Sequence, residues 1–173
     1  MNDRSADSIP MPAPDLPAGS FIGRESFRQH VRDALSEAAR AGWRELMLSD
    51  AHFLDWPLGE RGVVEALTRW AMRGQRLTLL ARRYDEMERI HPLFVRWRRQ
   101  WDHRIDCRQV SAAEDAEIPS LIWTPVWALQ RLEPVRFAGV CGPEPERREG
   151  LRLLLDEWLQ RSTPGFPATT LGL

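Results

Sequence analysis

The sequence predicts an α/β fold with a mixed, mostly parallel sheet of five or six strands and helices on both faces. Short, continuous apolar runs alternate with longer segments whose apolar residues recur every three or four positions. The chain has 173 residues, 43% of them hydrophobic and 28% charged, a composition typical of globular proteins. At this length roughly 70% of the unfolded surface can be buried. We therefore expect one domain, over residues 20–162.

The first half of this domain alternates helices and strands. A helix is expected between Ser20 and Gly42, since its apolar residues lie three or four positions apart. The run 44–49 is short and mostly apolar, as in a buried strand. A second helix is expected to end at about Arg73, and a second buried strand follows at 76–81.

The next elements continue this alternation. A third helix is expected over 84–101, bent or split at His91 because Pro92 follows. The alternating pattern of 104–110 predicts a strand with one buried face, and an acidic loop follows at 111–118.

The second half of the domain predicts a β hairpin and a closing helix. The run 121–123 with 126–132 and the run 135–141 are linked by Glu133–Pro134, which suits antiparallel pairing. The last helix is entered through Glu144–Pro145 and carries its leucines on one face.

The two ends of the chain differ from the domain. Residues 1–19 hold four prolines and few large apolar side chains, so we expect a disordered leader. They lack the apolar core of a secretion signal, and no segment has the ~20 apolar residues of a membrane span. Residues 163–173 are expected to form a tail. These features favour a cytoplasmic protein with no membrane partner.

All 24 basic residues are arginine, and the chain contains no lysine. This excludes Schiff-base chemistry, the phosphate-loop lysine and any His-x-Lys site. The four histidines lack metal-site spacing, so we expect no metal and no cofactor. Cys107 and Cys141 are expected to be buried thiols, and a disulfide between them is the less favoured alternative.

The order of elements resembles one half of the phospholipase D-like fold, over residues 21–162. The stretch Arg76–Val110 is similar to the strand-helix-strand that precedes the catalytic segment of that family, and Arg136–Leu159 resembles its closing strand and helix. Active members carry His-x-Lys followed by Asp. The corresponding run Leu121–Leu132 holds neither His nor Asp. The resemblance therefore implies a degenerate single-half domain without that catalysis.

A second resemblance is to a small uncharacterised bacterial family. It rests on the segments Gly42–Glu45, Ser49–Asp50 and Trp127–Leu132. No activity follows from it.

Polar residues follow the first two expected strands, where α/β sheets bind ligands. Asp50 and His52 follow the first strand, and Arg82, Arg83 and Tyr84 follow the second. Together they predict a cradle for a phosphate or carboxylate. In the alternative interpretation, Arg82 pairs with a neighbouring acid and the group only closes the sheet.

The stretch 76–108 is the most basic part of the chain. Arg96, Arg98 and Arg99 are interleaved there with Trp97 and Trp101, so a stripe of residues that binds nucleic acid has to be considered. The overall charge of −1 argues against nucleic acid as a partner, and the favoured interpretation is a helix with a solvated arginine face.

Trp123 and Trp127 flank a Thr-Pro turn in the hairpin and are candidates for a protein interface. Since active phospholipase D-like proteins join two halves, this predicts a homodimer. The alternative is that both rings fill the core.

Three functions follow, in order of preference. The first is a non-catalytic domain acting through an unidentified protein partner or through anion binding, with no catalytic residue. The second is an enzyme acting on a phosphate ester or another small anionic metabolite, with Asp50 and His52 as acid and base and Arg82 and Arg83 as clamp. The third is nucleic-acid binding through Arg96, Arg98 and Arg99.

Overall fold

The computed structural model describes residues 11–167. The strands are β1 (Gly19–Phe21), β2 (Glu45–Ser49), β3 (Arg76–Ala81), β4 (Ile105–Gln109), β5 (Ser120–Trp123), β6 (Ala128–Glu133), β7 (Ala138–Gly142) and β8 (Thr163–Pro164). The helices are α1 (Arg24–Ala41), α2 (Arg61–Ala71), α3 (Met87–Ile90), α4 (Pro92–Gln100) and α5 (Pro145–Gln160), with 3₁₀ turns η1 (Asp102–Arg104) and η2 (Asp115–Glu117).

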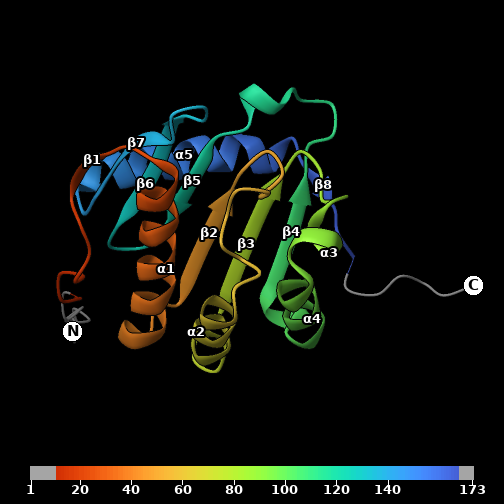
Figure 1. Cartoon of the computed structure of the whole chain (residues 1–173), viewed down its shortest axis with the longest axis horizontal. Helices are drawn as coiled ribbons and strands as arrows, with labels where there is room; N and C mark the ends of the chain where they lie inside the picture. Colours follow the sequence, from red (N-terminus) through yellow and green to blue (C-terminus); the bar gives the residue numbers. More distant parts are fainter. Residues whose placement is uncertain (1–10, 168–173) are drawn as a thin grey trace, which may run out of the picture.

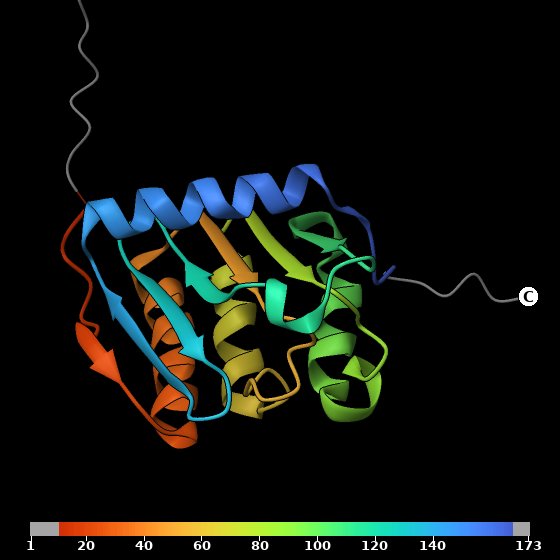
Figure 2. The ribbon, with the colours of Figure 1, turned by 90° about the horizontal axis from the view of Figure 1, so that it is seen from above.

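These elements form three layers. A single sheet with the order β1-β7-β6-β5-β2-β3-β4-β8 lies in the middle. Helices α1, α2 and α4 cover one face, and α5 crosses the other face alone (Figures 1 and 2). The α/β class and the helices on both faces are confirmed.

The sheet is larger and less parallel than expected. Only β2, β3 and β4 run parallel in the described residues, and the other neighbouring pairs are antiparallel. The connections around β5, β6 and β7 are too short for a crossover helix, which forces antiparallel pairing. Strands β1 and β8 have three and two residues, too few to give an apolar pattern. The expectation of a mostly parallel sheet of five or six strands was therefore wrong.

The helices follow the predicted apolar spacing. The inner face of α1 is buried, and Gly42 ends the helix in the left-handed conformation, where its amide donates to the carbonyl of Ala38. Pro92 divides the third predicted helix into α3 and α4 at His91, because proline has no amide to continue the helix.

The core lies on both sides of the sheet. One cluster fills the space beneath α1, α2 and α4, and a smaller one lies beneath α5. Trp70 of α2 anchors the larger cluster, since its indole Nε1 donates to the carbonyl of Trp43, 2.6 Å away. Cys107 and Cys141 are free, buried thiols, as expected, and burial raises the pKa of each to about 11.

Segments flanking the predicted domain contact it. The indole Nε1 of Trp127 donates to the carbonyl of Pro17, and Leu16 packs against the larger core cluster. Residues 1–10 of the expected leader and 168–173 of the expected tail lie outside the described residues, and the division of the chain at 19 and 162 stays a prediction. No helix within residues 11–167 is long and apolar enough to span a membrane.

Gly74 provides a test of this packing. A Cβ at this position would lie 2.3 Å from the ring of Trp70, whereas a Cβ at Gly150 in α5 meets nothing within 4 Å. Gly74→Ala should lower the free energy of unfolding in urea by about 1–3 kcal/mol through overpacking. The matched Gly150→Ala should raise it by about 0.5–1 kcal/mol. Equal effects of the two substitutions would contradict the close approach of Gly74 to Trp70.

Candidate functional site

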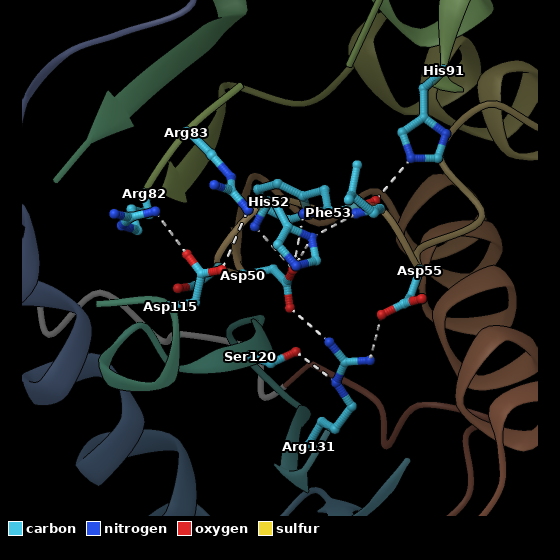
Figure 3. A network of polar contacts seen from close by, with 12 residues as sticks. Asp50, His52, Phe53, Asp55, Arg82, Arg83, His91, Asp115, Ser120 and Arg131 are labelled. Carbon is cyan, nitrogen blue, oxygen red and sulfur yellow. Dashed lines mark hydrogen bonds and ion pairs between the residues drawn. The ribbon is translucent and has the colours of Figure 1, made fainter. Parts of the chain in front are cut away.

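Asp50 follows β2 and supplies the carboxylate of the predicted cradle (Figure 3). It is 2% exposed. Its Oδ2 accepts from the amides of His52 (3.2 Å) and Phe53 (2.8 Å), and its Oδ1 accepts from Arg131 Nη2 (2.9 Å). Asp50 therefore shapes the loop after β2 and pairs with a buried cation.

Arg131 of β6 completes this group, and sequence reasoning missed it. The side chain is 3% exposed, its Nε donates to Ser120 Oγ, and its Nη1 lies 3.6 Å from Asp55 Oδ2 (Figure 3). Its guanidinium lies 4.6 Å from the ring centroid of Phe27. The signal for its role was an arginine inside an apolar strand, which needs a buried partner.

The loop after β2 holds Phe53 at a φ of 59°, in the left-handed region that non-glycine residues rarely adopt. Two hydrogen bonds hold it there: its amide donates to Asp50, and its carbonyl accepts from His91 Nε2 at 2.8 Å. Burial lowers the pKa of His91. The neutral imidazole that donates through Nε2 is therefore part of the folded loop.

His52 is half-buried beside Asp50. Its Nδ1 accepts from the amide of Leu54 at 3.2 Å and lies 3.8 Å from Asp50 Oδ2. The structure thus brings the two residues of the proposed acid/base pair together. However, the charge of Asp50 is already balanced by Arg131.

The arginines of the predicted cradle are engaged elsewhere. Arg82 Nη1 and Arg83 Nη2 both pair with Asp115 of η2, at 3.1 and 3.4 Å (Figure 3). The hydroxyl of Tyr84 is buried and donates to a backbone carbonyl, with Leu79 and Arg108 offering acceptors at 3.1 and 2.9 Å. Burial raises the pKa of that hydroxyl well above its usual range.

Tyr84 is therefore corrected from ligand contact to core residue. Anion binding by the other four residues stays a prediction. Asp50 is already paired with Arg131, and Arg82 and Arg83 share Asp115, which resembles the alternative in which the group closes the sheet.

The two hairpin tryptophans have different environments. Trp127 is 0% exposed, so its expected place in an interface is wrong. Trp123 is half-buried, donates from Nε1 to the carbonyl of Arg148 and carries the guanidinium of Arg152 over its ring at 4.8 Å. It lines a hollow of about 370 Å³ with the exposed Leu153. The homodimer and the unidentified protein partner stay predictions.

The three arginines of the stripe predicted on α4 also differ in their exposure and their partners. Arg98 is 5% exposed, pairs with Asp102 at 2.6 Å and donates to the carbonyl of Phe166, so it is not available to a nucleic acid. Arg99 lies 3.4 Å from Glu88, and Arg96 is exposed. Burial of Arg98 follows from its position on the same side of α4 as Phe94 and Val95, which also lie in the core.

A different set of arginines gathers at the edge of the sheet where β2, β3 and β4 begin, the lower edge in Figure 1. We call this set the basic edge. It comprises Arg40 at the end of α1, Arg44 before β2, Arg69 and Arg73 at the end of α2, Arg76 in β3 and Arg104 before β4. All are exposed except Arg104, which is half-buried.

Most of the positive charge of the basic edge has no acidic partner. In the segments 37–45, 69–76 and 102–106 every acidic side chain is in an ion pair, namely Glu37 with Arg40, Glu45 with Arg152, Asp102 with Arg98 and Asp106 with Arg76. Within residues 11–167, Arg44, Arg69, Arg73 and Arg104 are therefore left without an ion pair.

The basic edge is hollowed between α1 and α2. A depression of about 500 Å³ is lined by Arg40, Arg69 and Arg73 together with Ser36, Ala39 and Met72. Met72 is 66% exposed there. The hollow therefore offers three guanidinium groups around a partly apolar floor.

Backbone contacts hold the parts of the basic edge together. The amides of Gln75 and Arg76 both donate to the carbonyl of Arg44, at 2.8 and 3.1 Å. Arg104 Nη1 donates to the carbonyl of Gly74. The starts of β2, β3 and β4 therefore form one continuous surface, although they lie far apart in the sequence.

In the described part of the chain, no three His, Cys, Asp or Glu side chains gather as a metal site would require.

Comparison with known proteins gives a likeness of fold. No protein-family model matches the chain, and no curated protein matches it. Among solved structures it is similar to TrmBL2, an archaeal chromatin protein whose structure shows a novel mode of DNA binding. The TM-score is 0.65 at 12% sequence identity, over 91% of this chain and 57% of that chain. This chain thus corresponds to little more than half of TrmBL2.

This likeness corrects the resemblance drawn from the sequence. The order of elements suggested a phospholipase D-like half and a small uncharacterised bacterial family. A solved structure that matches is an archaeal chromatin protein, and no family model supports either assignment. Element order alone could not distinguish these possibilities, because it says nothing of strand pairing.

The Asp50–Arg131 pair can be tested by a double-mutant cycle. Arg131→Met leaves the Asp50 carboxylate buried without its cation, and should lower the free energy of unfolding by about 3–5 kcal/mol. Adding Asp50→Asn removes the stranded charge and should restore part of that loss. Urea denaturation of the wild type, both single variants and the double variant measures the coupling. Strict additivity would contradict the pairing.

The buried His91 predicts a loss of stability in acid. Its pKa is lowered in the folded state, as is that of the partly buried His30. As the pH falls below about 6.5, histidine in the unfolded chain binds a proton that the folded protein excludes. Stability is therefore full above this pH and declines below it. His91→Asn should flatten the fall in melting temperature between pH 7.5 and 5, whereas the exposed His103→Asn should not. Identical slopes for His91→Asn and the wild type would refute the role of His91.

Proposed function

We propose that this protein binds nucleic acid through the basic edge and acts as a binding module. The proposal depends on the observation that Arg69 and Arg73, which line the hollow between α1 and α2, are exposed and have no ion pair within residues 11–167. Guanidinium groups match phosphate oxygens in a bidentate geometry, and phosphate contacts supply most of the affinity of non-specific binding.

The overall charge of −1 does not oppose this proposal, because the charge is unevenly placed. Binding depends on the field of the face that meets the ligand. Elsewhere, many arginines are neutralised in pairs: Arg28 and Arg32 both contact Glu60, which lowers the pKa of that carboxyl to about 2.

The location of the basic edge differs from both sites expected from the sequence. Arg96 and Arg99 lie along α4, and the cradle lies at the opposite ends of the parallel strands. A phosphate-ester enzyme is the weaker proposal, because a substrate at the cradle would have to displace Asp115 from Arg82 and Arg83.

The likeness to TrmBL2 supports the proposal at the level of fold. It means that a chain of this shape occurs in a protein that binds DNA. The residues proposed for binding rest on the charges and the hollow described above, not on that likeness.

The proposal is tested by the salt dependence of binding to a fluorescently labelled 20-nucleotide DNA or RNA. We expect anisotropy titrations to show binding at 50 mM salt that weakens steeply by 200 mM. Arg69→Gln with Arg73→Gln should reduce the slope of log K against log salt by about 0.7–0.9 for each lost phosphate contact.

The matched control is Arg24→Gln with Arg61→Gln. These arginines are exposed, lack ion pairs within residues 11–167 and begin the same two helices, at their far ends. The control removes the same charge and should leave the slope unchanged. Failure to bind at 50 mM salt, or an equal effect of the control, would overturn the proposal.

A further inference from the structure

We propose that the basic edge takes single-stranded nucleic acid, with an unpaired base stacked against Trp101 and His103. This inference rests on the function proposed above and names the class of ligand. Its grounds are an aromatic pair at the end of the basic edge and the solvent exposure of that pair.

The aromatic pair lies where α4 gives way to β4. Trp101 follows the last residue of α4, and His103 lies in η1. Their ring centroids are 5.9 Å apart with an interplanar angle of 35°. The amide of Arg104 donates to the carbonyl of Trp101 at 2.8 Å, which fixes the turn that brings the two rings together.

This pair adjoins the arginines. Arg104 is next to His103 in the chain, and its guanidinium donates to the carbonyl of Gly74, the residue after Arg73. A strand of nucleic acid that contacts Arg73 and Arg104 through phosphates would therefore lie near η1, the turn that carries His103.

The exposure of the rings is the second ground. Trp43, Trp70 and Trp97 are each at most 2% exposed, so their rings belong to the core. Trp101 is half-buried and His103 is exposed. One side of Trp101 packs against the larger core cluster, which holds the ring in place.

The face of Trp101 is also free of cations. The rings of Trp123 and Trp158 each lie beneath a guanidinium, at 4.8 and 4.4 Å. Within residues 11–167, no guanidinium lies over Trp101. A planar group can therefore approach it without displacing an arginine.

These features distinguish single strands from duplexes. Bases within a duplex are already stacked on their neighbours, whereas single strands expose base faces to aromatic side chains beside a basic groove. A duplex can use only the arginines of the basic edge. A single strand can use the arginines and the aromatic pair together, and should bind more tightly.

The test uses three probes of one sequence at 50 mM salt: a labelled 20-nucleotide single strand, its duplex, and a single strand with abasic sites at its centre. The wild type should bind the single strand about tenfold more tightly than the abasic strand or the duplex. His103→Ala and Trp101→Leu should each weaken single-strand binding several-fold and leave both the salt slope and duplex binding unchanged.

His103→Ala keeps the test sound if Trp101→Leu disturbs folding, because the imidazole is exposed. Arg69→Gln with Arg73→Gln should instead weaken all three probes. Equal binding of the three probes, unaffected by His103→Ala, would overturn the stacking inference while the proposed function stood. If none of the probes binds, both proposals fail.

Discussion

The buried ion pair between Asp50 and Arg131 joins the two halves of the sheet. Asp50 follows β2, the first parallel strand, and Arg131 lies on β6 in the antiparallel half, where its Nε also donates to Ser120 of β5, the strand between them. The same guanidinium lies over Phe27 of α1. A charge left alone in this environment is strongly destabilising. The two halves of the sheet, the loop after β2 and the packing of α1 on the sheet are therefore interdependent.

This pair also determines where the molecule retains unbalanced charge. At the carboxyl ends of the parallel strands, Arg131 neutralises Asp50, and Arg82 and Arg83 share the carboxylate of Asp115. Ligands of α/β sheets usually bind at those ends. Here Arg44, Arg69, Arg73 and Arg104, which have no ion pair within residues 11–167, lie at the opposite ends, where the carbonyl ends of α1 and α2 also favour cations. The helix dipole explains Arg40 and Arg69. Arg44 and Arg104 lie outside the α-helices, so the dipoles of α1 and α2 do not account for them.

Sequence periodicity predicted the elements whose burial is local and missed those whose burial depends on distant partners. The buried face of α1 and the break at Pro92 follow from spacing and from proline chemistry. By contrast, the residues next to Arg98 in the chain do not predict its contact with Phe166. The guanidinium of Arg98 donates to the carbonyl of Phe166 and lies over its ring. The basic edge likewise depends on distant parts of the chain, because it forms only when the starts of three strands meet.

At two places in the structure, lysine could not replace arginine. At Arg131 a single planar fork reaches Asp50, Ser120 and Asp55 while stacking on an aromatic ring. A lysine ammonium could reach one of those partners but could not stack as a plane. The same planarity suits the basic edge, where a guanidinium can meet two oxygens of one phosphate. Replacing arginine by lysine should therefore be conservative at neither place, although the charge is kept. At Arg131 the substitution loses packing and hydrogen bonds. At the basic edge it loses only the bidentate geometry of the contact with phosphate.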